Sequence, residues 1–96
     1  MALTFEWDED KALTNKKKHQ VDFEEASSVF ADPLARIFGD EAHSIEELRE
    51  ILIGHSELGR LLLVSFTERG PDRIRIISAR VATKKERKGY EEREGR

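Results

Sequence analysis

The sequence predicts an α+β domain in which two N-terminal helices pack on a twisted antiparallel sheet of about four strands, followed by a short C-terminal helix. Two observations carry this prediction. Apolar side chains recur at helical spacing before Pro33, and after it they form short alternating runs between turns that contain glycine. This order of elements favours helices covering one face of an antiparallel sheet.

Length and composition limit the class of protein. The 96 residues fit one domain, 1–96, with residues 91–96 expected as a frayed tail. Charged residues make up 39% and apolar residues 38%, which predicts a thin core. The absence of cysteine excludes disulfides and thiol chemistry. No apolar run is long enough to cross a membrane, so we expect a cytoplasmic protein without a membrane partner.

The N-terminal third predicts a short strand and two helices. Residues 4–7 alternate as in a strand, and Asp8 is the expected N-cap of a helix that ends at about Lys18. Asp22 is the expected N-cap of the second helix, with Glu25 completing a capping box. Its apolar stripe consists of Phe23, Ala26, Val29 and Phe30, and Asp32-Pro33 ends it.

The rest of the chain predicts four strands and a last helix. Thr83 and Glu86 form a second capping box, and Gly89 weakens the helix that they begin. Tyr90 is the main apolar side chain of that helix. The expected strands are 34–38, 47–53, 60–68 and 74–81, separated by turns at 39–41, 54–59 and 70–72.

Positive charge gathers in the C-terminal half, although the whole chain carries a net charge of −3. Between Arg60 and Lys88 lie nine basic and three acidic residues, a local excess that can bind phosphates. The competing interpretation is a solvated sheet edge followed by an ordinary charged helix. The basic residues are Arg60, Arg69, Arg73, Arg75 and Arg80, then Lys84, Lys85, Arg87 and Lys88.

Alternate positions of the last two strands become polar toward the strand ends. The two sets are Leu61, Leu63, Ser65, Thr67 and Arg69, and Ile74, Ile76, Ser78 and Arg80. Both sets are expected on the sheet face that the helices leave bare, where Ser65, Thr67 and Ser78 would form a polar floor. A slip of one residue in the register would exchange the two faces.

Several classes of chemistry find no support. His19, His43 and His55 lack the spacing of metal ligands, no glycine-rich phosphate loop follows a strand, and no serine sits on a strand–helix elbow. We therefore expect neither a metal nor another cofactor.

Several segments resemble the BrnT toxins of bacterial type II toxin–antitoxin systems. The matching motifs are FEWD at 5–8, KH at 18–19, FEEA at 23–26, DPL at 32–34, IGHS at 53–56, GRLL at 59–62 and IRIISAR at 74–80. In BrnT proteins a glycine usually follows the Lys-His pair, whereas this chain has Gln20.

This resemblance implies a RelE-like fold and a small ribonuclease that stops translation. It also implies a neutralising BrnA-type antitoxin, through which alone the toxin would reach DNA. By their positions, Arg60, Arg80 and Tyr90 match the strand arginine, the later arginine and the helix tyrosine that serve RNA cleavage in the RelE group. The thin core and the half-bare sheet predict a heterotetramer of two toxins and two antitoxins.

Metal-free RNA cleavage needs a base for the 2′-hydroxyl, a cation for the phosphorane and an acid for the leaving 5′-oxygen. Arg80 and Arg69 suit the cation, because a guanidinium can bind two phosphate oxygens. His19 is the first candidate for proton transfer, although it could simply cap its helix, and Glu57 is the second. Tyr90 could stack on a base or donate a proton. The expected RNA-binding cations are Lys18, Arg75, Lys84, Lys85, Arg87 and Lys88.

Two hypotheses of different class remain from the sequence. One is a ribonuclease toxin, and the other is a non-catalytic module that binds RNA or a protein on the same basic sheet face. The first predicts that Arg80 lies at the mouth of the open face with its charge free for the scissile phosphate.

Overall fold

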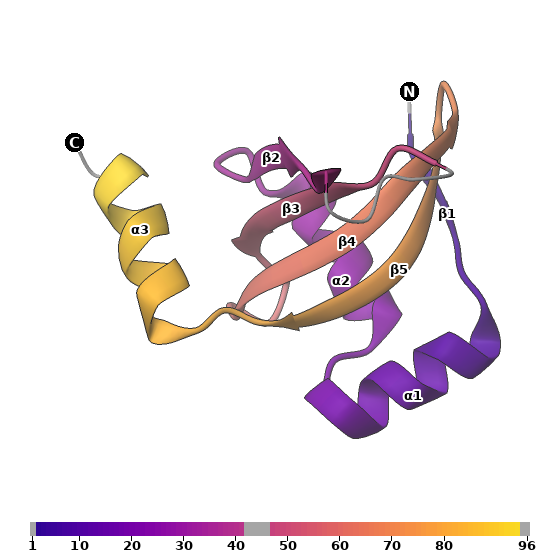
Figure 1. Cartoon of the computed structure of the whole chain (residues 1–96), viewed down its shortest axis with the longest axis horizontal. Helices are drawn as coiled ribbons and strands as arrows, with labels where there is room; N and C mark the ends of the chain where they lie inside the picture. The colour runs from indigo at the N-terminus through magenta and orange to yellow at the C-terminus, as the bar shows by residue number, and fades with distance from the viewer. Residues whose placement is uncertain (1, 42–46, 95–96) are drawn as a thin grey trace.

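The computed structural model describes residues 2–41 and 47–94. The predicted loop position of His43 lies outside them. Figure 1 shows a twisted sheet with α2 behind it and α3 standing off at one end. The elements are β1 (Thr4–Glu6), α1 (Glu9–His19), α2 (Phe23–Ser28), a 3₁₀ helix (Val29–Ala31), β2 (Arg36–Gly39), β3 (Glu50–His55), β4 (Leu61–Gly70), β5 (Arg73–Val81) and α3 (Lys84–Glu94).

The sheet has five strands, in the order β1-β5-β4-β3-β2, and not about four. The opening strand β1 joins the sheet and runs parallel to β5, with Thr4 beside Arg73, while the other pairs are antiparallel. The prediction of a purely antiparallel sheet was therefore wrong. A run of three or four alternating residues predicts a strand but carries no information about its partner.

The two N-terminal helices take different positions, and only α2 covers the sheet face. Phe23 and Ala26 of α2 pack with Val64, Phe66 and other buried side chains in the main core. Helix α1 lies along the edge of β5 beyond the end of β1. There the buried Asn15 amide accepts from the Ala79 N–H (3.0 Å) and donates to its carbonyl (2.8 Å), so that one side chain replaces a neighbouring strand.

The ends of α1 follow local chemistry. The Asp8 carboxylate accepts from the N–H groups of Asp10 (2.8 Å) and Lys11 (3.1 Å), which confirms it as the N-cap. The helix ends at His19, and its C-cap is Gln20, whose φ of 56° lies in the left-handed region. Glycine adopts this conformation without strain, so Gln20 stands at a position that would suit glycine.

The capping box predicted for α2 does not form. Asp22 makes no side-chain cap bond, and its carboxylate accepts from Lys16 Nζ instead (2.8 Å). Glu25 turns inward and is buried, where it binds Arg60. The half-exposed Arg60 guanidinium binds this carboxylate in place of the helix terminus.

An irregularity in β5 decides which side chains face the open side of the sheet. Ser65 pairs with Ser78 but Phe66 pairs with Ile76, so Ile77 is an extra residue. Ile74 and Ile76 consequently lie in the main core, while Ser78 and Arg80 lie on the open face. The expectation that all four share the open face was wrong for the two isoleucines. Thr67 is also buried, and donates to the Leu48 carbonyl (2.7 Å).

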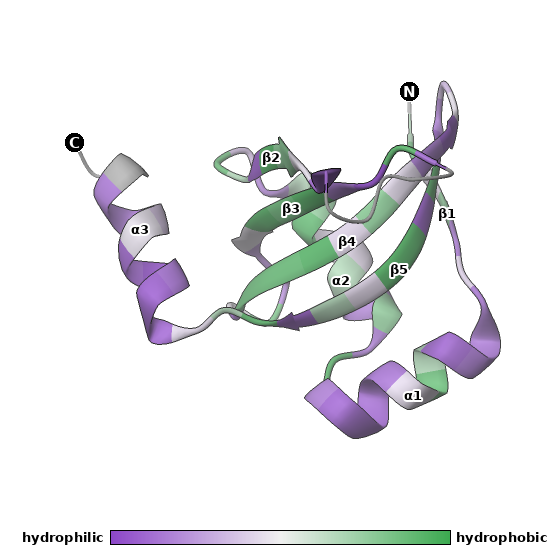
Figure 2. Ribbon diagram, viewed as in Figure 1, coloured by the Kyte–Doolittle hydropathy of each residue, from purple (hydrophilic) through white to green (hydrophobic). Residues whose placement is uncertain are grey.

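Helix α3 begins with the predicted capping box and continues to Glu94, past the end expected at Tyr90. The Thr83 hydroxyl accepts from the Glu86 N–H (3.1 Å), and the Glu86 carboxylate accepts from the Thr83 N–H (2.9 Å). Figure 2 shows α1 and α3 as mainly hydrophilic beside the hydrophobic strands. Tyr90 anchors α3 against Ile53 and Leu61. Within the described ranges, no helix is long and apolar enough to cross a membrane.

Candidate active site

The open face of the sheet carries two adjoining hollows. The smaller has a volume of about 270 Å³ and is lined by His19, Ser65, Ser78 and Arg80 together with Ile51, Leu63 and Ala79. The larger, of about 700 Å³, extends toward β2 beneath α3. Arg80, Leu63 and Ile51 line both, so the two hollows form one continuous surface.

The smaller hollow joins two residues that the sequence singled out separately. His19 is the last residue of α1, and the bonds between Asn15 and Ala79 fix that helix turn against β5. Arg80 follows Ala79 and points to the same face as Ser78. A group that can exchange protons and a permanent cation therefore flank a floor of two hydroxyls. Asn15 is a positioning residue that the sequence does not reveal, because a lone mid-helix asparagine carries no recognisable pattern.

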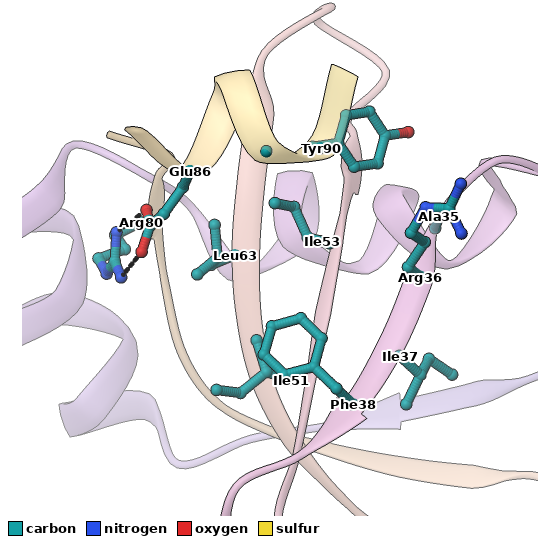
Figure 3. Close-up of a pocket in the computed structure, with 11 residues that line it drawn as sticks. Ala35, Arg36, Ile37, Phe38, Ile51, Ile53, Leu63, Arg80, Glu86 and Tyr90 are labelled. Atoms are coloured by element: carbon teal, nitrogen blue, oxygen red, sulfur yellow. Dashed lines mark hydrogen bonds and ion pairs between the residues drawn. The ribbon is translucent and has the colours of Figure 1, made fainter. Parts of the chain in front are cut away.

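Arg80 lies at the mouth of the open face as predicted, but its charge is not free. Its two terminal nitrogens donate to the two carboxylate oxygens of Glu86, both at 2.8 Å (Figure 3). The hydrogen bonds from Arg80 lower the pKa of Glu86 to about 2, and Glu86 raises the pKa of Arg80. In the sequence Glu86 is recognisable only as a helix cap, whereas in the structure its carboxylate binds both the Thr83 N–H and Arg80.

Arg80 keeps donors for a ligand despite this pair. A guanidinium has five N–H groups, and Glu86 accepts two of them. The Val81 carbonyl accepts a third, long bond from Nη1 (3.4 Å). The pair therefore orients the half-exposed Arg80 side chain at the edge of the hollow. Its Nε–H and one Nη2–H do not bind Glu86 or Val81 and remain for a ligand.

Arg60 lies on the helix-covered side and not with Arg80. Its Nε donates to Glu25 (3.0 Å), and its Nη2 donates to Glu25 and to the Gln20 carbonyl (3.0 Å). The bonds from Arg60 hold the pKa of Glu25 below its ordinary value, against the opposing effect of burial. The Ser56 hydroxyl donates to the same carboxylate (2.7 Å). This arrangement joins α2 to the β3–β4 turn.

Of the other predicted catalytic residues, Tyr90 lines the larger hollow with Arg80, whereas Arg69 and Glu57 line neither hollow. Arg69 is exposed near the β4–β5 turn. It lies six residues along β4 from Leu63, the partner of Arg80, and so about 20 Å from it along the strand. Glu57 lies in the exposed β3–β4 turn, where its N–H donates to Ser28 Oγ (2.8 Å). Tyr90 is buried, and its hydroxyl donates to the Leu34 carbonyl (3.2 Å).

The predicted RNA-binding cations divide into two groups. Lys18 lines a third hollow with His19 and Ser78, and three lysines are exposed on α3, namely Lys84, Lys85 and Lys88. Arg75 instead pairs with Glu6 of β1 (3.1 Å), and Arg87 approaches Glu91 at 3.9 Å. Among residues 2–41 and 47–94, no three His, Cys, Asp or Glu side chains are placed to hold a metal ion.

Fold and site together define a small α+β protein with a half-open, cationic sheet face. The family model described as "Ribonuclease toxin, BrnT, of type II toxin-antitoxin system" matches residues 7–86. The crystal structure of the Brucella abortus ribonuclease toxin BrnT is similar, with a TM-score of 0.68 and 27% identity, covering 86% of this chain and 100% of that one. No curated protein gives a significant match.

The chain belongs to the BrnT family of ribonuclease toxins of type II toxin–antitoxin systems. The resemblance noted in the sequence is thereby confirmed. Membership of this family implies endoribonuclease activity and an antitoxin partner.

Proposed function

We propose that this chain cleaves RNA, without a metal ion, in the hollow between His19 and Arg80. The observation that carries the proposal is that one hollow holds both side chains, although they are 61 positions apart in sequence. These two residues supply the proton transfer and the positive charge that cleavage by the neighbouring 2′-hydroxyl requires. The exposed lysines of α3 and Lys18 would hold the flanking phosphates.

In the proposed reaction, His19 takes the proton of the 2′-hydroxyl as its oxygen attacks the adjacent phosphorus. Arg80 stabilises the negative charge of the phosphorane with its remaining N–H donors. The bond from phosphorus to the 5′-oxygen then breaks, and that oxygen takes a proton from protonated His19 or from water. The products are a 2′,3′-cyclic phosphate and a 5′-hydroxyl, so atoms and charge balance.

The biological setting that we propose follows from the family. The fold is RelE-like, RNA cleavage inhibits translation, and a BrnA-type antitoxin neutralises the toxin in a complex of two copies of each. Complex formation is supported by the thin core and the uncovered sheet face, which a partner could cover.

Cleavage of a single-stranded RNA in the presence of a metal chelator tests the proposal. The wild type should cleave it, and one 2′-deoxy substitution before the scissile bond should stop the reaction there. Arg80→Ala should cleave about a hundred- to a thousandfold more slowly, and Arg80→Lys should recover only part of this loss. Arg73→Ala, at the exposed start of β5, is the matched control.

Two results would refute the proposal. One is RNA that stays intact with the wild type but still binds it, which would identify a non-catalytic binding module. The other is full activity of Arg80→Ala. Unfolding curves of each variant distinguish lost catalysis from lost folding.

A further inference from the structure

The larger hollow contains a row of side chains that runs straight across four strands. Arg36 pairs with Ile53, Ile53 with Leu63, and Leu63 with Arg80. One step along the strands, a second row on the same face joins Phe38, Ile51, Ser65 and Ser78. Two guanidiniums thus stand at opposite rims of an apolar floor, as Figure 3 shows. Three steps between neighbouring strands separate their Cα atoms by about 14 Å.

Arg36 differs from Arg80 in that no residue within 2–41 and 47–94 pairs with it. Its Nε is buried, and no acceptor or carboxylate among the described residues binds the guanidinium. Arg60, Arg75 and Arg80, by contrast, each pair with a carboxylate. A buried N–H without an acceptor is costly, and the half-buried guanidinium that carries it has donors left for an anionic ligand.

We infer that the larger hollow is a subsite for one nucleotide of single-stranded RNA next to the cleaved bond, with Arg36 binding its phosphate. This inference rests on the proposed function. The base lies on Ile53 and Leu63 beside the Phe38 ring, which is the combination of apolar or aromatic platform and cation that holds unpaired bases. The volume of about 700 Å³ is within the range of small-ligand sites.

Continuity with the smaller hollow favours RNA over an acidic peptide. Arg80, Leu63 and Ile51 line both hollows, so a strand whose phosphate lies at Arg80 has its neighbouring nucleotide over this floor. Lys84, Lys85 and Lys88 are exposed on α3, the helix that also carries Glu86 and Gly89 of the hollow. RNA carries a phosphate and a planar base on every nucleotide. This repeat matches a surface on which the cations Arg80 and Arg36 lie at either side of an apolar floor.

Gly89 allows the subsite to be filled without disturbing the core. It lines the hollow from α3, on the same helix face as Glu86, and a Cβ added there meets no atom within 4 Å. Gly89→Leu should therefore occupy the hollow and also favour the helix. Glu92→Leu adds the same side chain at an exposed position of α3 and is the matched control.

The experiment measures binding of a short single-stranded RNA whose 2′-hydroxyls are all methylated, so that it cannot be cleaved. Removing one base at a time should identify one position where the wild type loses about tenfold in affinity. Gly89→Leu should bind the intact RNA about as weakly as the wild type binds that abasic RNA. Removing the same base should not lower the affinity of Gly89→Leu further. Arg36→Gln should weaken binding to a similar degree, and Glu92→Leu should behave as the wild type.

The inference is overturned if Gly89→Leu and Arg36→Gln both bind RNA as the wild type does, or if they weaken only binding of the antitoxin. Cleavage of unmodified RNA by the same variants keeps the two proposals separate. Activity that depends on Arg80 but not on Arg36 or position 89 would leave the proposed function standing without the subsite. A wild type that loses affinity when that one base is removed, but cleaves no RNA, would support the subsite and refute the proposed function.

Discussion

Arg60 shows how the same residue type can serve structure in one place and chemistry in another. Glu25 is only 5% exposed, so Arg60 compensates for a carboxylate that burial would otherwise disfavour. Arg60→Ala should lower the free energy of unfolding by about 2–3 kcal/mol at neutral pH, because it leaves this charge unpaired. Urea unfolding at several pH values measures the loss.

The loss should depend on pH in a defined direction. In the wild type the folded pKa of Glu25 is below the ordinary value of 4.5, so the pair stabilises the fold above that pH and the effect disappears as the pH falls through the lower pKa. The deficit of Arg60→Ala should therefore shrink below about pH 4.5. A variant that is fully stable but fails to cleave RNA would instead assign Arg60 to catalysis.

The pKa of Glu86 is lowered like that of Glu25, but here the ionised carboxylate affects catalysis as well as stability. Its folded pKa of about 2 keeps it ionised beside Arg80 throughout the neutral range, so it holds that arginine in one orientation. Glu86→Gln should reduce kcat about tenfold with little change in KM, because the guanidinium loses its fixed position in the transition state. Its stability deficit, about 1 kcal/mol, should be constant above pH 5 and vanish toward pH 2.

Thr83→Ala separates these roles, since it removes the other half of the capping box but leaves the pair with Arg80. It should cost about 1 kcal/mol in stability and leave kcat unchanged. Equal loss of kcat in both variants would mean that Glu86 acts only through the helix.

At the scale of elements, α1 depends on one polar side chain. The helix has little apolar surface, and Asn15 binds both backbone groups of Ala79 and the Val21 carbonyl (3.1 Å). Asn15→Ala should cost about 2–3 kcal/mol, because it leaves buried backbone groups at the edge of β5 unsatisfied. It should also lower the cleavage rate, since His19 follows one turn later on the same helix.

The control for this variant is Thr14→Ala, an exposed neighbour on the same helix. It should change stability by less than about 0.5 kcal/mol. If Asn15→Ala retained full activity per folded molecule, the position of His19 would not depend on the contact with β5.

For the whole molecule, local signals in the sequence predicted what is local in the structure. Caps at Asp8 and Thr83, the apolar stripe of α2 and the β4–β5 turn were all visible, because each depends on neighbouring residues. The parallel pairing of β1, the extra residue at Ile77 and the partners of Glu25 depend on distant segments. Arg36 was missed for the same reason, since only the register places it opposite Arg80.

The distribution of charge over the whole molecule should be visible in the salt dependence of RNA binding. A chain with a net charge of −3 binds a polyanion only where its cations are concentrated. If about four cations contact phosphates, log Kd should rise with log salt concentration with a slope of about 3, since each contact with single-stranded RNA contributes about 0.7. Replacing Lys84 and Lys85 together by Gln should reduce this slope by about 1.4.

The comparison that makes this prediction specific is Lys17→Gln with Arg73→Gln, which removes two positive charges from exposed positions away from α3. Both double variants have the same net charge, so a purely global effect would weaken RNA binding equally in the two. If RNA lies along α3, the slope should fall only for the double variant of Lys84 and Lys85, while the rate of cleavage of bound RNA stays the same. Equal slopes in the two double variants would show that α3 does not lie along the RNA.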